Sequence, residues 1–140
     1  MDYRHMAEKL LDIRANMPQI KAERQLSKMM IGENFAMNYL ASNNNEAYPK
    51  DLSKSMMVSS ARIAVILKQL ERDGLITRTV DAQDNRKVIV RLTDKGAHLI
   101  EKDRSVLLEG LVEMLEYLGP EDAEAYIRIR RKLLKMMLEK

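Results

Sequence analysis

The stretch from Pro49 to Gly96 constrains the fold most strongly, because its hydrophobic period changes from that of a helix to that of paired strands. Apolar residues at i, i+3, i+4 and i+7 predict a helix over residues 59–72, with a buried face made of Ile63, Ile66, Leu67 and Leu70. A turn at Asp73-Gly74 ends this helix. Two β-prone runs follow, Leu75–Val80 and Lys87–Leu92, and predict a hairpin. Pro49 predicts the start of a shorter helix upstream, over residues 49–54.

The opposite face of the helix over residues 59–72 is polar and basic. It carries Ser59, Ser60, Arg62, Lys68, Gln69 and Arg72. The hairpin loop, residues 81–86, has no glycine or proline and ends in Arg86, which predicts a protruding charged tip. A basic helix face beside such a tip suits a nucleic-acid duplex, with a groove for each element.

The distribution of charge supports this interpretation better than the total charge does. The net charge of the 140-residue chain is only +3. Between Lys50 and Lys95 there are ten basic and six acidic residues, so this third carries +4 and the rest of the chain sums to −1. We therefore expect the middle third to meet the phosphate backbone of a nucleic acid.

The composition excludes several other classes of protein. With 46% hydrophobic and 32% charged residues, we expect one folded domain. The absence of cysteine excludes disulfides, thiolate catalysis and thiol-based redox sensing. No run reaches the roughly 18 apolar residues of a membrane span, and the N-terminus lacks the apolar segment of a signal peptide. We therefore expect a cytoplasmic protein without membrane contact.

The sequence shows no catalytic or metal-binding constellation. The two histidines, His5 and His98, lie on different predicted elements and have no second ligand at metal-site spacing. There is no nucleophile–base pair and no phosphate-binding loop. We therefore expect no enzyme activity, no metal and no cofactor.

The rest of the chain is predicted to be helical, so the fold class is mainly α with a small β-hairpin. Helices are expected over residues 2–17, 26–42, 94–118 and 120–139, with a polar connector at 19–25. The second helix is expected to run through Gly32, and Thr93 is expected to cap the third. The first and the last two helices carry wide apolar stripes that the remaining chain is too short to cover. We expect them to intertwine with a second copy.

Three motifs lie in the predicted hairpin and its flanks. They are Leu70-Glu71-Arg72-Asp73-Gly74-Leu75-Ile76, Asp81-Ala82-Gln83-Asp84-Asn85-Arg86-Lys87 and Val90-Arg91-Leu92-Thr93-Asp94-Lys95-Gly96. These motifs resemble those of the MarR family of bacterial winged-helix transcription regulators. They match the family patterns L-E-x-x-G-L-I, D-x-x-D-x-R and L-T-x-x-G in order and in spacing. The resemblance covers nearly the full length of the chain.

The resemblance implies a winged helix-turn-helix DNA-binding region at residues 26–96 and dimerisation helices at residues 1–25 and 97–140. It implies a homodimer on a pseudo-palindromic operator of double-stranded DNA, with the helix over 59–72 in the major groove and the wing in the adjacent minor groove. Arg86 matches the family's wing-tip arginine, and Asp84 matches the acidic residue that holds the wing.

The resemblance also implies repression that is relieved by a small ligand. In the family this effector is frequently aromatic or phenolic, and it binds between the dimerisation helices and the DNA-binding lobe. The sequence does not identify the residues that would bind it. Met29, Met30, Met56 and Met57 are expected to pack in the core rather than line such a pocket.

One departure from the family lies at the centre of the predicted recognition helix. The family often has threonine and a long polar or basic residue where this chain has Ala64 and Val65. The residues left for hydrogen-bonding readout are Ser59, Ser60, Arg62 and Lys68. Ala64 or Val65 would instead contact thymine methyl groups.

Each proposed contact also has a structural alternative. Arg62 lies in the N-terminal turns, where recognition helices contact bases, and this favours contact over solvation. Lys68 is as consistent with solvation as with phosphate contact. Arg86 is expected to enter the minor groove. Asp84 would hold the loop through Arg86 or Arg62, or would simply be a common turn residue. Backbone phosphates are expected to meet Lys50, Lys54, Lys87 and Arg91.

The sequence therefore predicts a sequence-specific DNA-binding transcriptional regulator. Two alternatives remain. One is a winged-helix module that binds proteins and not DNA, against which Arg86 and the local positive charge argue. The other is a helical dimer that handles a small molecule, against which the missing catalytic constellation argues.

Overall fold

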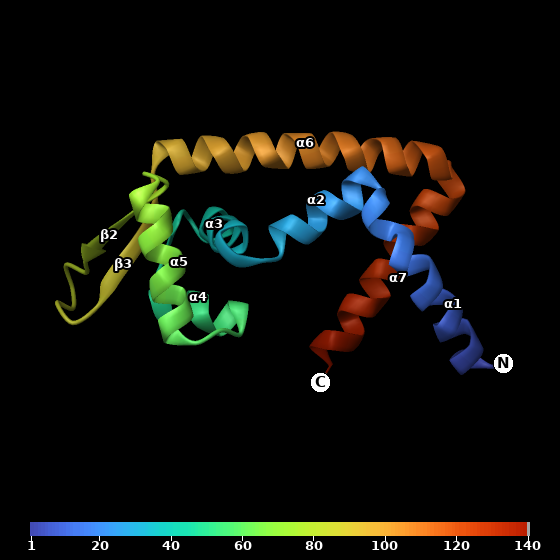
Figure 1. Cartoon of the computed structure of the whole chain (residues 1–140), viewed down its shortest axis with the longest axis horizontal. Helices are drawn as coiled ribbons and strands as arrows, with labels where there is room; N and C mark the ends of the chain where they lie inside the picture. Colours follow the sequence, from blue (N-terminus) through green and yellow to red (C-terminus); the bar gives the residue numbers. More distant parts are fainter. Residues whose placement is uncertain (140) are drawn as a thin grey trace.

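One long helix, α6 (Asp94–Leu118), runs along one side of the molecule and joins its two ends (Figure 1). The computed structural model describes residues 1–139. One end holds α3 (Gly32–Ser42), α4 (Pro49–Met56), α5 (Ser60–Arg72) and the hairpin of β2 (Ile76–Val80) and β3 (Val88–Leu92). The other end holds α1 (Tyr3–Asn16) and α7 (Pro120–Leu138), while α2 (Lys21–Met29) packs on α6 between the two ends. The molecule is therefore elongated, and the predicted class of mainly α with a small β-hairpin is confirmed.

The hydrophobic core lies in the end that carries the hairpin. It is built from Ala36, Met37, Leu40, Leu52, Ile63, Ile66, Leu67, Leu70, Leu75, Ile76, Val90 and Ile100. The four residues predicted to form the buried face of α5 are each at most 3% exposed. Burial of large aliphatic side chains is the main favourable term in folding, so this cluster holds α5 and the hairpin together.

Side-chain caps begin the two helices that flank the hairpin. The Ser59 hydroxyl accepts a hydrogen bond from the Arg62 amide at 3.1 Å and begins α5. The Thr93 hydroxyl accepts from the Gly96 amide at 3.0 Å and donates to the Gly74 carbonyl at 2.7 Å. Thr93 therefore caps α6, as predicted, and also ties it to the turn that follows α5.

The hairpin belongs to a three-stranded sheet of order β1-β3-β2. Strand β1 (Glu46–Ala47) pairs antiparallel with β3, with Glu46 opposite Arg91 and Ala47 opposite Val90. Asn44 and Asn45, both left-handed with φ of 59° and 64°, turn the chain from α3 into β1. The sequence did not predict this strand, because two residues are too few to show the alternation of apolar and polar residues that is typical of a strand.

The prediction of one continuous helix over residues 26–42 is wrong. Helix α2 ends at Met29 and α3 begins at Gly32, whose φ of +53° is incompatible with a continuing right-handed helix. Helix α2 begins at Lys21, after a short 3₁₀ turn η1 (Met17–Gln19), and so occupies much of the expected connector. The proposed region boundary between residues 25 and 26 falls inside α2. Within residues 1–139, no helix has the length and apolar character that a membrane crossing requires.

Candidate nucleic-acid interface

The outward face of α5 presents all of the residues predicted to read the major groove. Ser59, Ser60, Arg62, Ala64, Val65 and Lys68 are exposed. Val65 is 59% exposed although it is aliphatic, so it lies outside the core. The Ser59 hydroxyl is used to cap the helix. In the described part of the chain, none of the ion pairs involves Arg62, so its guanidinium is available to a ligand.

Arg86 lies at the tip of the wing and is held by its own loop. The Asp84 carboxylate accepts from the Arg86 amide at 3.0 Å and from Arg86 Nε at 3.1 Å. These hydrogen bonds hold the pKa of Asp84 below its ordinary value. The Arg86 side chain remains 90% exposed. Asp84 therefore bonds to Arg86 and not to Arg62, and the pair orients a guanidinium that still faces solvent.

The base of the wing contains two residues that sequence reasoning did not single out, Tyr48 and Asp81. Asp81 is only 7% exposed. One carboxylate oxygen accepts from the Tyr48 hydroxyl at 2.7 Å, and the other accepts from the Gln83 amide at 3.0 Å. The Gln83 amide, followed by the Tyr48 hydroxyl, lowers the pKa of Asp81, and the hydrogen bond to Asp81 raises the pKa of Tyr48. The family motif begins at Asp81, but no local signal pointed to Tyr48, 33 residues away.

The residues predicted to contact phosphates differ in whether their side chains already interact with other residues. Lys50 and Lys54 are exposed on α4. The Lys87 ammonium lies over the Tyr48 ring, 5.2 Å from its centroid. Arg91 is engaged across the sheet, since its Nε donates to Glu46 at 3.0 Å and its Nη1 donates to Thr79 at 3.1 Å. Arg91 therefore links the three strands, and the lysines are better placed to meet phosphates.

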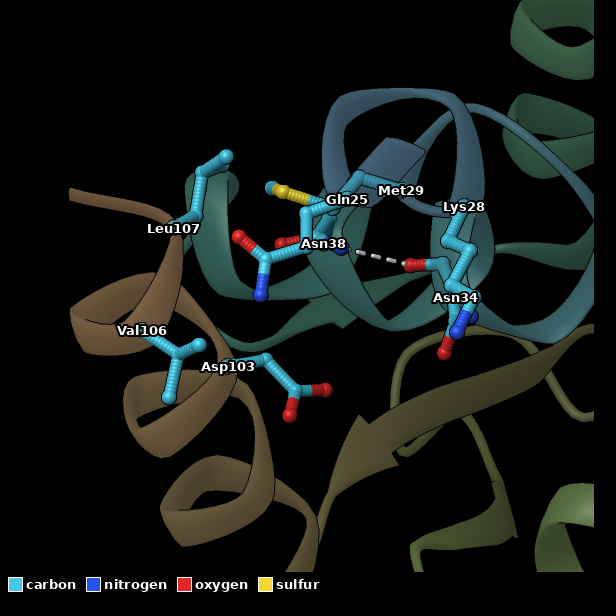
Figure 2. Close-up of a pocket in the computed structure, with 8 residues that line it drawn as sticks. All are labelled: Gln25, Lys28, Met29, Asn34, Asn38, Asp103, Val106 and Leu107. Carbon is cyan, nitrogen blue, oxygen red and sulfur yellow. Dashed lines mark hydrogen bonds between the residues drawn. The ribbon is translucent and has the colours of Figure 1, made fainter. Parts of the chain in front are cut away.

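A cavity of about 280 Å³ lies between α2, α3 and α6 (Figure 2). It is lined by Gln25, Lys28, Met29, Asn34, Asn38, Asp103, Val106 and Leu107. The Asn38 side-chain Nδ2 donates to the backbone carbonyl of Asn34 at 2.8 Å. Gln25 Oε1 is buried and has no hydrogen-bond partner within residues 1–139. This oxygen lies against Gly110, where an added β-carbon would be 3.3 Å from it, and a buried acceptor without a partner is costly.

The methionines predicted to be core residues divide into two groups. Met56 packs against the core, and Met29 is partly buried where it lines the cavity of Figure 2. Met30 and Met57 are 66% and 91% exposed, so the prediction is wrong for both, and it is also wrong for Met29, which lines the cavity and does not belong to the core cluster. Met30 follows the end of α2 and Met57 is a left-handed residue that ends α4, and both positions turn the side chain away from the core. They line a second groove, which also reaches Arg62.

No group of three or more histidine, aspartate or glutamate side chains in the described part of the chain is arranged to hold a metal. The site is instead a set of exposed cationic side chains on α4, α5 and the wing. Such a set offers charge and hydrogen-bond donors to an anionic polymer.

Comparison with known proteins identifies the family. Residues 19–102 match the transcriptional regulator family SarA/Rot, and this segment includes the helix-turn-helix and the wing. The chain belongs to this family. The family consists of transcriptional regulators, not enzymes. The chain is 33% identical over 89 residues to the uncharacterised HTH-type transcriptional regulator YdgJ of Bacillus subtilis, a match that covers 64% of this chain and 54% of YdgJ. The match thus spans about half the length of this relative.

Solved structures place this SarA/Rot member in the wider MarR fold. A MarR family protein from Bacillus stearothermophilus is 26% identical, with a TM-score of 0.78 and 99% of both chains covered. MepR, a transcription regulator of the multidrug efflux pump MepA of Staphylococcus aureus, is 27% identical, with a TM-score of 0.71 and coverage of 94% of this chain and 97% of MepR. A MepR mutant bound to an oligodeoxyribonucleotide is 25% identical, with a TM-score of 0.64 and coverage of 94% and 97%. The predicted resemblance to MarR regulators is confirmed.

Proposed function

We propose that this SarA/Rot member is a sequence-specific regulator that binds double-stranded DNA as a homodimer. The observation that carries the proposal is the exposed, basic face of α5 beside a wing whose tip arginine is oriented and exposed. The two elements lie at the same end of the molecule, as Figure 1 shows. A MepR mutant has been solved with an oligodeoxyribonucleotide, and this supports DNA as the ligand of the shared fold.

The proposed roles follow from chemistry and position. Helix α5 enters the major groove, where Arg62 contacts base edges and Val65 meets thymine methyl groups. Arg86 enters the adjacent minor groove, whose negative potential attracts a guanidinium. Lys50, Lys54 and Lys87 bind phosphates, which supply affinity without sequence preference. With two copies related by a two-fold axis, the half-sites would lie about one helical turn apart on a pseudo-palindrome.

The homodimer is supported by apolar surface at the other end of the molecule. The exposed large apolar residues there include Leu10, Leu11 and Ile13 of α1, Leu108 and Val112 of α6, and Ile127, Ile129, Leu133, Leu134, Met136, Met137 and Leu138 of α7. A monomer rarely leaves so contiguous an apolar surface in water. A second copy would cover it with the same helices.

We further propose that the cavity of Figure 2 binds a small effector and that the effector relieves repression. The cavity lies between α2 and α6, which connect to the proposed dimer helices, and α3 of the DNA-binding lobe. A ligand that fills the space against Met29 and Leu107 would hold these helices at one spacing. Such a ligand changes DNA affinity only if it binds that spacing better than the DNA-bound one.

The test of DNA binding is Arg86→Ala, measured by fluorescence anisotropy on duplexes selected from a random pool. We expect about tenfold weaker binding, the size of effect expected for a lost groove contact. Arg128→Ala, an exposed arginine on α7, is the matched control and should bind as the wild type does. Wild-type protein that shows no salt-sensitive binding at low salt, or full affinity after Arg86→Ala, would overturn the proposal and favour a protein-binding module.

The test of the effector cavity is Val106→Trp, which would fill the cavity with an indole ring. The probes are salicylate and simple phenols, added to the preformed protein–DNA complex. We expect release of DNA from the wild type and from the surface control Glu101→Trp, but not from Val106→Trp. Equal release from all three proteins would place the effector elsewhere.

A further inference from the structure

The wing loop, residues 81–87, is held from outside the hairpin by a single side chain. Within residues 1–139, one hydrogen bond and one cation–π contact reach this loop from outside the hairpin. Tyr48 makes both of them. Its hydroxyl donates to Asp81 at 2.7 Å, and its ring faces the Lys87 ammonium at 5.2 Å. Asp81 and Lys87 are the first and last residues of the loop, so one tyrosine contacts both ends.

The contact with Asp81 continues through the loop to its tip. The Asp81 carboxylate also accepts from the Gln83 amide, and the Asp81 amide donates to the Lys87 carbonyl at 2.9 Å. The Lys87 amide donates to the Asp84 carbonyl at 3.0 Å, and the Asp84 carboxylate holds Arg86. A continuous chain of short hydrogen bonds therefore links Tyr48 to Arg86.

Tyr48 is itself fixed by the elements on either side of it. It follows β1, which pairs with β3, and it precedes Pro49 at the first turn of α4. Its carbonyl accepts from the amides of Asp51 and Leu52 at 3.0 and 3.3 Å, and Leu52 is fully buried. Helix α4 packs against α5. The loop is therefore anchored to the same rigid unit that carries the recognition helix.

We propose that Tyr48 is the positioning residue of the wing, which sets the direction of Arg86 relative to α5. This inference rests on the proposed DNA-binding function. Strand β1 pairs only with Val90 and Arg91, so the outer part of the hairpin is two-stranded. Such a ribbon is marginally stable by itself, so an unanchored tip samples several orientations. Only the fraction of molecules whose wing tip is aligned, here called the aligned share, can place Arg86 and Arg62 in neighbouring grooves at the same time. The apparent dissociation constant for DNA rises as this aligned share falls.

The test compares Tyr48→Phe with Tyr39→Phe on the same selected duplex. Tyr48→Phe removes the hydrogen bond to Asp81 but keeps the ring under Lys87. Tyr39 is a neighbouring tyrosine whose hydroxyl has no recorded hydrogen bond in the described residues, so it is the matched control. We expect Tyr48→Phe to weaken binding about fivefold, as when the aligned share falls to about one fifth, and Tyr39→Phe to leave binding unchanged.

A positioning role predicts coupling that a general loss of stability does not. In an Arg86→Ala background, Tyr48→Phe should cause no further loss of affinity, because no arginine remains to be oriented. Asp81→Ala should weaken binding as Tyr48→Phe does, and combining the two should add nothing. We also expect Tyr48→Phe to reduce the preference for A·T-rich over G·C-rich flanks, where the minor groove is narrow.

The outcomes separate this inference from the function on which it rests. If Arg86→Ala weakens binding but Tyr48→Phe binds as the wild type does, the positioning role is overturned and the DNA-binding function stands. Equal losses from Tyr48→Phe with and without Arg86 would also overturn it. Wild-type protein that does not bind DNA would instead overturn the function. Should Tyr48→Phe lower the melting temperature, the comparison of its effect with and without Arg86 decides the matter, because a general loss of stability weakens binding in both backgrounds.

Discussion

At the residue scale, the arginines of the interface differ in what holds them. Arg78 pairs with Glu71 at 2.9 Å and ties β2 to the end of α5, and the hydrogen bonds from Arg78 lower the pKa of Glu71. Arg91 bridges the three strands. Arg86 is oriented by Asp84 but exposed, while Arg62 has no ion pair in the described chain. Arg78 and Arg91 therefore help to build the wing, whereas Arg62 and Arg86 remain to contact a ligand.

This division predicts different effects for Arg62→Ala and Lys54→Ala. Arg62→Ala should cost about 1–3 kcal/mol on the selected DNA and relax the sequence preference, because a base contact is lost. Lys54→Ala should weaken all DNA alike and lower the slope of log K against log salt by about one, because a phosphate contact is lost. Anisotropy titrations at several salt concentrations, on selected and random duplexes, measure both effects. Equal effects of the two variants on both kinds of DNA would contradict the assignment.

At the element scale, the motif L-T-x-x-G has a steric explanation. The α-carbon of Gly96 lies in the first turn of α6, where that helix crosses the turn after α5. A β-carbon at Gly96 would lie 2.2 Å from the Leu75 carbonyl oxygen and 3.0 Å from Leu92 Cδ2. The Leu75 carbonyl accepts from the Thr93 amide, so the backbone there has little freedom to move away. Glycine at this position allows α6 to pack against the wing.

Gly96→Ala should therefore destabilise the fold more than Gly32→Ala. The first forces backbone atoms apart, at a cost of about 3 kcal/mol. The second only places alanine at a φ of +53° with no atom within 4 Å of its β-carbon, at a cost of about 1 kcal/mol. Thermal unfolding, monitored by circular dichroism at one protein concentration, ranks the stabilities of the two variants. The surface variant Lys102→Ala is the reference. A smaller loss of stability for Gly96→Ala than for Gly32→Ala would show that the backbone can relax where α6 crosses the turn after α5.

At the scale of the whole molecule, the two ends have opposite surfaces. The end with α5 and the wing buries its apolar residues in a core and exposes cationic side chains. The end with α1 and α7 exposes large apolar side chains, and these two helices contain no buried residue. One end therefore suits an anionic polymer, and the other suits a second copy of the same chain.

Leu134→Asp should split the proposed dimer and abolish operator binding. Leu134 is 53% exposed on α7, and an aspartate buried at an apolar interface would carry an unpaired charge. Lys132→Asp, on the opposite side of the same helix, is the matched control and should remain dimeric. Sedimentation velocity measures the mass of each. A Leu134→Asp protein that sediments as a dimer would place the interface elsewhere.

The sequence by itself determined the elements that have a clear hydrophobic periodicity, or that begin or end at a capping or helix-breaking residue. The buried face of α5, the two strands of the hairpin, the Thr93 cap and the end of one helix at residue 118 with the start of the next at residue 120 were all predicted, because each depends on residues close together in the chain. The exposed site residues of α5 followed from the same periodicity. The motif that begins at Asp81 also marked the wing without any structure.

Only the tertiary structure decided the features that join distant segments. Strand β1 exists because β3 offers it a partner, and the break at Gly32 lets α2 lie on α6 while α3 enters the core. Tyr48 meets Asp81, Arg91 meets Glu46, and Gln25 faces the cavity only after the chain has folded. The stretch from Pro49 to Gly96 therefore encodes a helix and a wing locally. The direction in which the wing points depends on a tyrosine that lies just outside that stretch.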